Sequence, residues 1–347
     1  MLARLLLLYC GWFYILITLL WLILRAIVFD RIWWVAIANS YILYFLALLP
    51  LLLIAAVWGR CWRLLLGLSV PVLAFLGLYG ALFVPAIANL ASGNGSAVTV
   101  MTFNVLLGNV DAAPLMTVIR EHHPDILGLQ ELTPELADAL IPQLIKDYPY
   151  TTVELPLQSK SEVVGVVSRF PIQAKTTFPL GGVRYGINVN TQEEFILPGP
   201  RLGTRATVLI DQQPVEVAVV DLMHNPLFST PLNQWGAAAS EYYRQKKFEI
   251  DRLKQELQQE NHPFLLLCDC NFQDTSESYA QLSRVAQDSF YEKGWGLGRT
   301  AVFNLGLPTQ RLDYIWYSKE FRPLEAIAGQ DRSSSDHFPV IAKLQLR

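Results

Sequence analysis

Acidic, amide and imidazole side chains follow apolar runs at five places in the chain. The stretches are Val98–Asn104, Asp125–Glu131, Val219–His224, Leu265–Asn271, and the late pair Arg311–Asp313 with Ser335–His337. Each run reads as a buried strand, so each polar group is expected at a strand end. Asp and Asn also start turns, which would explain one such tip. Five tips in a chain with only five histidines indicate a catalytic or metal site.

Glu131 is the strongest candidate metal ligand. It follows an apolar strand and precedes a helix, and hard divalent ions such as Mg²⁺ prefer one or two carboxylates with several waters. Asn104 could supply a neutral oxygen beside it. The alternatives are a charge at a helix N-terminus for Glu131 and a turn-forming role for Asn104.

Asp269 and Asn271 form an Asp-x-Asn pair at the end of the most apolar strand. An aspartate there can orient or deprotonate a water molecule, and the asparagine can hold a phosphoryl oxygen. The alternative is an Asx turn. His224 ends another apolar strand and is a second candidate for contact with phosphate.

An acid and an imidazole are adjacent at Asp336 and His337, and Asp313 lies one strand earlier. A carboxylate beside histidine raises its pKa and fixes its tautomer. A protonated His337 could then stabilise negative charge on phosphorus. Taken alone, His337 would also fit a structural histidine.

Charge divides the 347-residue chain into two regions. Residues 1–95 hold five arginines and one aspartate, a net charge of +4, and the whole chain carries −3, so residues 96–347 carry −7. An acidic soluble region argues against a general nucleic-acid binder. The four cysteines are too few and too poorly placed to predict a zinc site or a disulfide framework.

Residues 1–90 are expected to form a membrane region with about three transmembrane helices. The apolar stretches are Leu5–Val28, Trp33–Trp58 and Leu64–Leu90, each long enough to span a bilayer. A cleaved signal peptide is the alternative for the first stretch. Two spans with a re-entrant or interfacial segment is the main alternative overall, because Pro50 and Pro71 interrupt the pattern.

The arginines suggest an orientation. With three spans, Arg4, Arg60 and Arg63 lie on one side, while Arg25 and Arg31 lie opposite and are partly offset by Asp30. The positive-inside rule then predicts a cytoplasmic N-terminus and an extracytoplasmic C-terminal domain. The Gly- and Ser-containing linker 91–96 reaches at most ~20 Å, so this domain must lie close to the bilayer.

Residues 97–347 alternate strand-like and helix-like segments. The expected strands are Val98–Asn104, Asp125–Gln130, Val163–Ser168, Thr204–Ile210, Val215–Leu222, Phe264–Cys268, Leu312–Tyr317 and Phe338–Leu344. The expected helices are Ala113–His122, Pro134–Lys146 and Gln234–Gln259. Because several strands follow one another without a helix, the pattern favours an α/β sandwich of mixed sheets over a doubly wound parallel sheet.

From about Val98 to Leu346 the chain resembles the endonuclease/exonuclease/phosphatase superfamily, the deoxyribonuclease I-like group. The motifs that carry the resemblance are Thr102-Phe-Asn104, Leu129-Gln-Glu131, Cys268-Asp-Cys-Asn271, Arg311-Leu-Asp313 and Ser335-Asp-His337. Two departures are the cysteines around Asp269 and the Asp-Leu-Met before His224, where many members have Asn-Thr-His. The Gly-rich stretch 294–300 resembles a loop of membrane-attached bacterial members.

The resemblance implies a four-layered α/β sandwich that hydrolyses phosphate esters with Mg²⁺ or Mn²⁺. It implies metal at Glu131, with Asn104 and Asp336. Asp269 would position the attacking water. In the remaining implied roles, phosphate contacts come from Asn271 and His224, and His337 is oriented by Asp313.

A membrane-anchored phosphodiesterase or nuclease is therefore the expected function. Sphingomyelinase-like hydrolysis of lipids and a non-catalytic membrane-tethered sensor are the alternatives. The expected partners are a phosphoester substrate (nucleic acid, lipid head group or small phosphodiester) and the lipid bilayer, with no obligate protein partner. The intact set of polar tips argues against the sensor.

Overall fold

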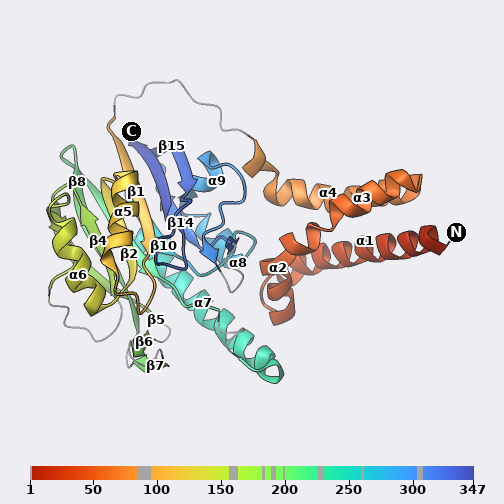
Figure 1. Ribbon diagram of the computed structural model, residues 1–347, viewed down its shortest axis with the longest axis horizontal. Coiled ribbons are helices and arrows are strands. Elements are labelled where there is room, and N and C mark those ends of the chain that lie inside the picture. Colours follow the sequence, from red (N-terminus) through yellow and green to blue (C-terminus); the bar gives the residue numbers. More distant parts are fainter. Residues whose placement is uncertain are drawn as a thin grey trace.

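The computed structural model describes residues 2–84, 95–155, 163–181, 184–188, 193–197, 200–225, 230–258, 262–302 and 308–347. An α/β body holds the C-terminal part of the chain, and N-terminal helices extend away from it (Figure 1). The predicted linker 91–96 and the end of the third apolar stretch fall largely outside the described residues.

Two mixed six-stranded sheets form the α/β body. The first has the order β15 (Phe321–Ala328), β16 (Val340–Leu346), β1 (Ala97–Asn104), β2 (Ile126–Leu132), β4 (Val163–Ser168) and β3 (Tyr150–Thr151). The second has the order β11 (Gln287–Asp288), β14 (Asp313–Tyr317), β10 (Phe264–Asp269), β9 (Gln213–Asp221), β8 (Arg201–Ile210) and β5 (Ile172–Gly181). The pairs β1 with β2 and β9 with β10 are parallel, whereas the other pairs in these two sheets are antiparallel. The predicted mixed sheets are confirmed.

Alternate residues of the central strands pack into different cores, which gives the fold four layers. In β10, Leu265 and Leu267 face the other sheet, whereas Leu266 and Cys268 face helices. The sheets approach so closely that a Cβ on Gly128 would lie 2.9 Å from the Cβ of Leu267. The outer layers are α5 (Ala112–His122) and α6 (Pro134–Leu144) on one side, and α7 (Trp235–Gln258) and α8 (Glu277–Leu282) on the other.

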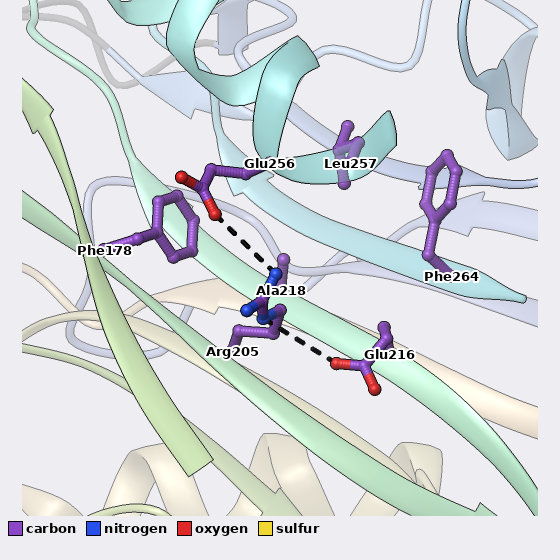
Figure 2. Close-up of a pocket in the computed structure, with 7 residues that line it drawn as sticks. All are labelled: Phe178, Arg205, Glu216, Ala218, Glu256, Leu257 and Phe264. Carbon is purple, nitrogen blue, oxygen red and sulfur yellow. Dashed lines mark ion pairs between the residues drawn. The ribbon is translucent and has the colours of Figure 1, made fainter. Parts of the chain in front are cut away.

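The C-terminal end of α7 is fixed to the second sheet by charge. Arg205 on β8 lies between two carboxylates, 3.8 Å from Glu216 of β9 and 3.6 Å from Glu256 of α7 (Figure 2). Phe178 and Leu257 line the same pocket, and the Glu216 and Glu256 side chains are only 8% and 9% exposed. Water is therefore largely kept from the ion pairs, which strengthens them relative to exposed pairs.

The predicted helices and strands have counterparts at nearly the same residues. Two long strands were missed, β5 and β15, and both lie at sheet edges and contain a proline, Pro179 or Pro323. Proline is tolerated at an edge because no ladder partner is lost there, yet in a sequence it reads as a strand breaker. The remaining small elements are α9 (Ser289–Lys293) and the hairpins β6 (Arg184–Asn188) with β7 (Glu193–Leu197) and β12 (Ala301–Val302) with β13 (Pro308–Gln310).

The N-terminal region contains four apolar helices: α1 (Leu2–Val28), α2 (Trp33–Leu46), α3 (Leu49–Trp58) and α4 (Trp62–Tyr79). Within the described residues, two helical stretches are long and apolar enough to cross a membrane, α1 and Trp62–Phe83, and α2 with α3 adds a third if this pair, bent by 44°, is one span. The bend falls at Leu46–Leu49, next to Pro50 at the start of α3. Proline fits the first turn of a helix but ends the one before it.

Candidate active site at the strand ends

The register of the second sheet brings three carboxylates together. Asp269 at the end of β10 lies opposite Asp221 at the end of parallel β9 and opposite Asp313 at the start of antiparallel β14. In the first sheet, Asn104 ends β1 next to Gln130 of parallel β2. The polar residues predicted at strand ends therefore lie together at one end of the two packed sheets, and both sheets contribute side chains.

Asn104 links the two sheets. Its amide nitrogen donates to Glu131 Oε1 at 2.9 Å and to Asp269 Oδ2 at 2.8 Å, and its oxygen accepts from the backbone of Leu106 at 2.9 Å. Glu131 also accepts from the backbone nitrogen of Leu107. A carbonyl oxygen has two lone pairs, so the Asn104 oxygen keeps one for a further ligand.

Glu131 and Asn271 both adopt left-handed backbone conformations, with φ of 58° and 50°. The pairing of β2 with β4 shifts between Leu129 and Leu132, so Glu131 lies in a bulge. A bulge re-aims a side chain at the cost of ladder hydrogen bonds. Left-handed backbone conformations are uncommon in residues other than glycine, and they cluster at functional sites.

His337 is held in a buried hydrogen-bonded group. Its Nδ1 lies 2.7 Å from Asp313 Oδ2 and 3.9 Å from Asp269 Oδ2. Ser335 fixes the backbone here, because its hydroxyl donates to the carbonyl of Asn104 at 2.7 Å and accepts from the His337 nitrogen at 3.0 Å. The imidazole is thus oriented by Asp313 and faces the same carboxylate that Asn104 contacts.

Burial and mutual repulsion shape the charges. Burial, followed by the charges of Asp221 and Asp336, raises the pKa of Glu131 to about 7. Burial and the neighbouring Asp313 hold the pKa of Asp269 well above its usual range. For His337, burial lowers the pKa, but Asp313 and Asp269 outweigh it and the pKa lies well above the ordinary value. The site thus concentrates carboxylates around one imidazole.

Asp221 and Arg201 belong to the site but were not predicted. Asn271 Nδ2 donates to Asp221 Oδ1 at 3.3 Å and to the carbonyl of Leu222 at 2.9 Å. The buried Arg201 guanidinium pairs with Asp221 and donates to its carbonyl at 3.0 Å. Asp221 ends an apolar strand as the other candidates do, which was the available signal. Arg201 follows residues without strand periodicity, so no signal in the sequence marked it.

The remaining candidates lie at the margins. His224 is partly exposed three residues beyond β9, and Asp336 is partly exposed beside His337. The carbonyl of Asp336 accepts from Val302 at 2.9 Å, which anchors this loop to β12. Asp336 is close enough to Glu131 to raise its pKa.

A buried ion pair behind the site also went unpredicted. Lys246 of α7 lies 3.3 Å from Glu249 and donates to the carbonyls of Met223 at 2.6 Å and Cys270 at 3.2 Å. Glu249 accepts from the Met223 nitrogen at 3.1 Å. These bonds hold the backbone one residue before His224 and one residue before Asn271.

Cys268 and Cys270 form a disulfide on either side of Asp269. The expectation that the cysteines are badly placed for a disulfide is therefore wrong for this pair. Strict strand alternation points residues i and i+2 to the same face but keeps their Cα atoms farther apart than the 5.0 Å seen here. The strand ends at Asp269, so the backbone is free to bend there.

The carboxylates fit a hard divalent cation. Asp269, Asp313 and His337 offer ligand atoms within 4.8 Å of one another, but the His337 Nδ1 already contacts Asp313. The oxygens near Glu131 fit better, because Asn104 and His337 only partly offset the effects of burial and of the Asp221 and Asp336 charges, and a cation would lower the raised pKa. Oxygen ligands favour Mg²⁺ or Mn²⁺ over zinc.

Comparison with solved structures identifies the fold. An endonuclease/exonuclease/phosphatase family protein from Bacteroides thetaiotaomicron is 18% identical, with a TM-score of 0.55 over 73% of this chain and 99% of that chain. A protein from Bacteroides vulgatus described in the same way is 15% identical, with a TM-score of 0.56 over 73% and 100%. ANGEL2, a 2′,3′-cyclic phosphatase, is 15% identical, with a TM-score of 0.51 over 73% and 96%.

No curated protein matches the chain in sequence. The sequence profile of the Endonuclease/Exonuclease/phosphatase family matches residues 101–337, about two thirds of the chain, and spans every candidate site residue from Asn104 to His337. The chain therefore belongs to the endonuclease/exonuclease/phosphatase family of phosphoric ester hydrolases.

Proposed function

We propose that this protein is a membrane-anchored phosphodiesterase or nuclease that depends on a divalent metal ion. The observation that carries the proposal is the chain of contacts from the half-buried Glu131 through buried Asn104 to Asp269, ending at the His337–Asp313 pair. It joins a carboxylate suited to a cation with an acid and an imidazole suited to proton transfer.

In this proposal, Asp269 positions a water molecule and accepts its proton as the water oxygen attacks phosphorus. His337, oriented by Asp313, stabilises the negative charge that develops on the phosphoryl oxygens. Asn271 and His224 contact the phosphate, and the ester oxygen leaves as the new phosphorus–oxygen bond forms. Asn271 is supported by its bonds to Asp221 and Leu222, which fix the direction of its amide.

Glu131, with Asn104 and Asp336, would hold Mg²⁺ or Mn²⁺. Bound there, the ion supplies charge neutralisation for the phosphate. Support comes from the carboxylates that crowd Glu131.

Membrane anchoring by residues 1–90, with residues 97–347 as the catalytic domain, is part of the proposal. Gly59 packs beside Leu7, which puts the Arg60 turn at the N-terminal end of α1. Trp21, near the other end of α1, donates to Asn39 at 2.8 Å, and the Asn39 carbonyl accepts from Thr275 of the C-terminal domain at 2.7 Å. Arg4, Arg60 and Arg63 therefore gather at the far end, which favours a cytoplasmic N-terminus and an extracytoplasmic catalytic domain.

A test uses the full chain purified in detergent, stripped of metal, and supplied with Mg²⁺, Mn²⁺ or Ca²⁺. The substrates are bis(p-nitrophenyl) phosphate, plasmid DNA, short RNA and sphingomyelin. We expect hydrolysis of at least one with Mg²⁺ or Mn²⁺, loss with chelator, and none from an Asp269→Asn preparation. Full turnover in excess chelator would exclude the metal role, and inactivity on all four would count against the proposal.

Lipid phosphodiesters are the second candidate substrates, because the site is coupled to the N-terminal helices. Four residues after Asn271, the Thr275 hydroxyl donates to the carbonyl of Asn39 at 2.7 Å and its own carbonyl accepts from Arg25. This short path supports a position of the candidate active site near the proposed bilayer surface. The net charge of −7 on residues 96–347 also disfavours an extended nucleic-acid groove.

A further inference from the structure

A cleft separates the end of α1 from α8, away from the candidate active site. It encloses about 270 Å³ and includes Ile27, Phe29 and Arg31 on one wall and Glu277, Gln281 and Arg284 on the other. The Glu277 backbone nitrogen donates to Asp30, whose carboxylate also accepts from Asn39 at 2.6 Å. These bonds keep the two walls together.

The cleft lies where the head groups of a bilayer would be. Its apolar wall is the last turn of α1, a helix long enough to span, and Ile27 there is 69% exposed. Trp34 follows at the start of α2 and is 47% exposed, as expected for an aromatic residue at the interface. An acyl chain could follow the exposed face of α1, which would bring the phosphate of the same lipid into the cleft.

The charged residues at the cleft, which come from both walls, favour an anion. Arg31 and Arg284 are exposed, and neither makes an ion pair within the part of the chain that the structure describes. Among the described residues that line the cleft, Glu277 is the one carboxylate; Asp30 is buried behind the cleft, and its charge lies near that of Arg25. Two cations against one anion leave a net positive site.

We propose that this cleft binds the phosphate head group of an anionic glycerophospholipid. The inference rests on the membrane anchoring in the proposed function, and it is independent of the hydrolysis. The lipid bridges α1 and α8, and so reinforces the contact that the Asp30–Glu277 hydrogen bond makes. Arginine suits this ligand, because its planar guanidinium can donate two parallel hydrogen bonds to one phosphate group.

The test is native mass spectrometry of the full chain in detergent, titrated with short-chain phosphatidylglycerol or phosphatidylcholine. We expect tighter binding of phosphatidylglycerol. Arg31→Ala and Arg284→Ala should each weaken it about fivefold, which corresponds to ~1 kcal/mol, the upper value for a single exposed ion pair. Glu277→Gln should strengthen it. Arg120→Ala, an exposed arginine on α5, is the control and should change nothing.

Equal affinity for the two lipids would overturn the proposal, as would wild-type affinity in the Arg31→Ala/Arg284→Ala double variant. A melting curve shows that each variant is folded, and Glu277→Gln tests the site without removing an arginine. An Asp269→Asn protein should bind phosphatidylglycerol as wild type does, so failed hydrolysis and failed lipid binding are separate results. Carbonate extraction of cell membranes tests the anchoring itself.

Discussion

Lys246→Met should destabilise the protein strongly, because Lys246 is 1% exposed and its partner Glu249 is fully buried. The substitution removes the ion pair and the hydrogen bonds to Met223 and Cys270, leaving a buried carboxylate without its cation. Removing one partner of a buried pair costs about 3–5 kcal/mol. Burial already raises the pKa of Glu249, so protonation limits the loss to the lower part of that range.

The assay is thermal unfolding of the full chain in detergent at fixed pH. At ~2–4 °C per kcal/mol for a domain of this size, the expected fall in Tm is about 6–15 °C. Lys247→Met is the matched control, the same change at the next position on α7, where the side chain is exposed. A Lys246→Met/Glu249→Gln double variant should recover part of the loss, because the unpaired charge is gone.

The same substitution should lower kcat, since the lysine holds the backbone beside His224 and Asn271. A Tm within about 2 °C of wild type, with Lys247→Met equally unchanged, would refute the reasoning. A double variant that is less stable than Lys246→Met would also refute it, because the lost stability would then come from lost packing and not from the unpaired carboxylate.

Three further outcomes are expected. Asp269→Asn and His337→Ala should each reduce kcat by at least ~10²-fold with little change in KM. The far-ultraviolet circular dichroism spectrum of each variant should match that of the wild type. A near-normal kcat in either variant would remove that residue from the mechanism. Protease added to intact spheroplasts should degrade the catalytic domain and spare a cytosolic control, whereas survival until lysis would mean an inverted topology. Mass spectrometry of alkylated, unreduced protein should show Cys268 and Cys270 linked, and alkylation of both would contradict the disulfide.

Local patterns determined much of the fold. The alternation of apolar residues locates the buried strands, and the polar group after each run identifies Asn104, Glu131 and Asp269 as candidates. A polar residue at the end of a buried strand is a local signal, since it depends only on neighbours in sequence. Edge strands β5 and β15 lack that signal, because each contains a proline and exposes several of its side chains.

Pairing between distant segments decided the rest. Asp221 joins the candidate site, and the predicted Asp313 lies opposite Asp269, because β9 and β14 flank β10 in a particular register, and register depends on which strands pair. The contact of Asn39 with Thr275 joins residues 236 positions apart, so no local pattern encodes it. The sequence by itself determined which side chains stand at strand ends. The tertiary structure decided which ends meet, because burial and sheet pairing act between segments that are remote along the chain.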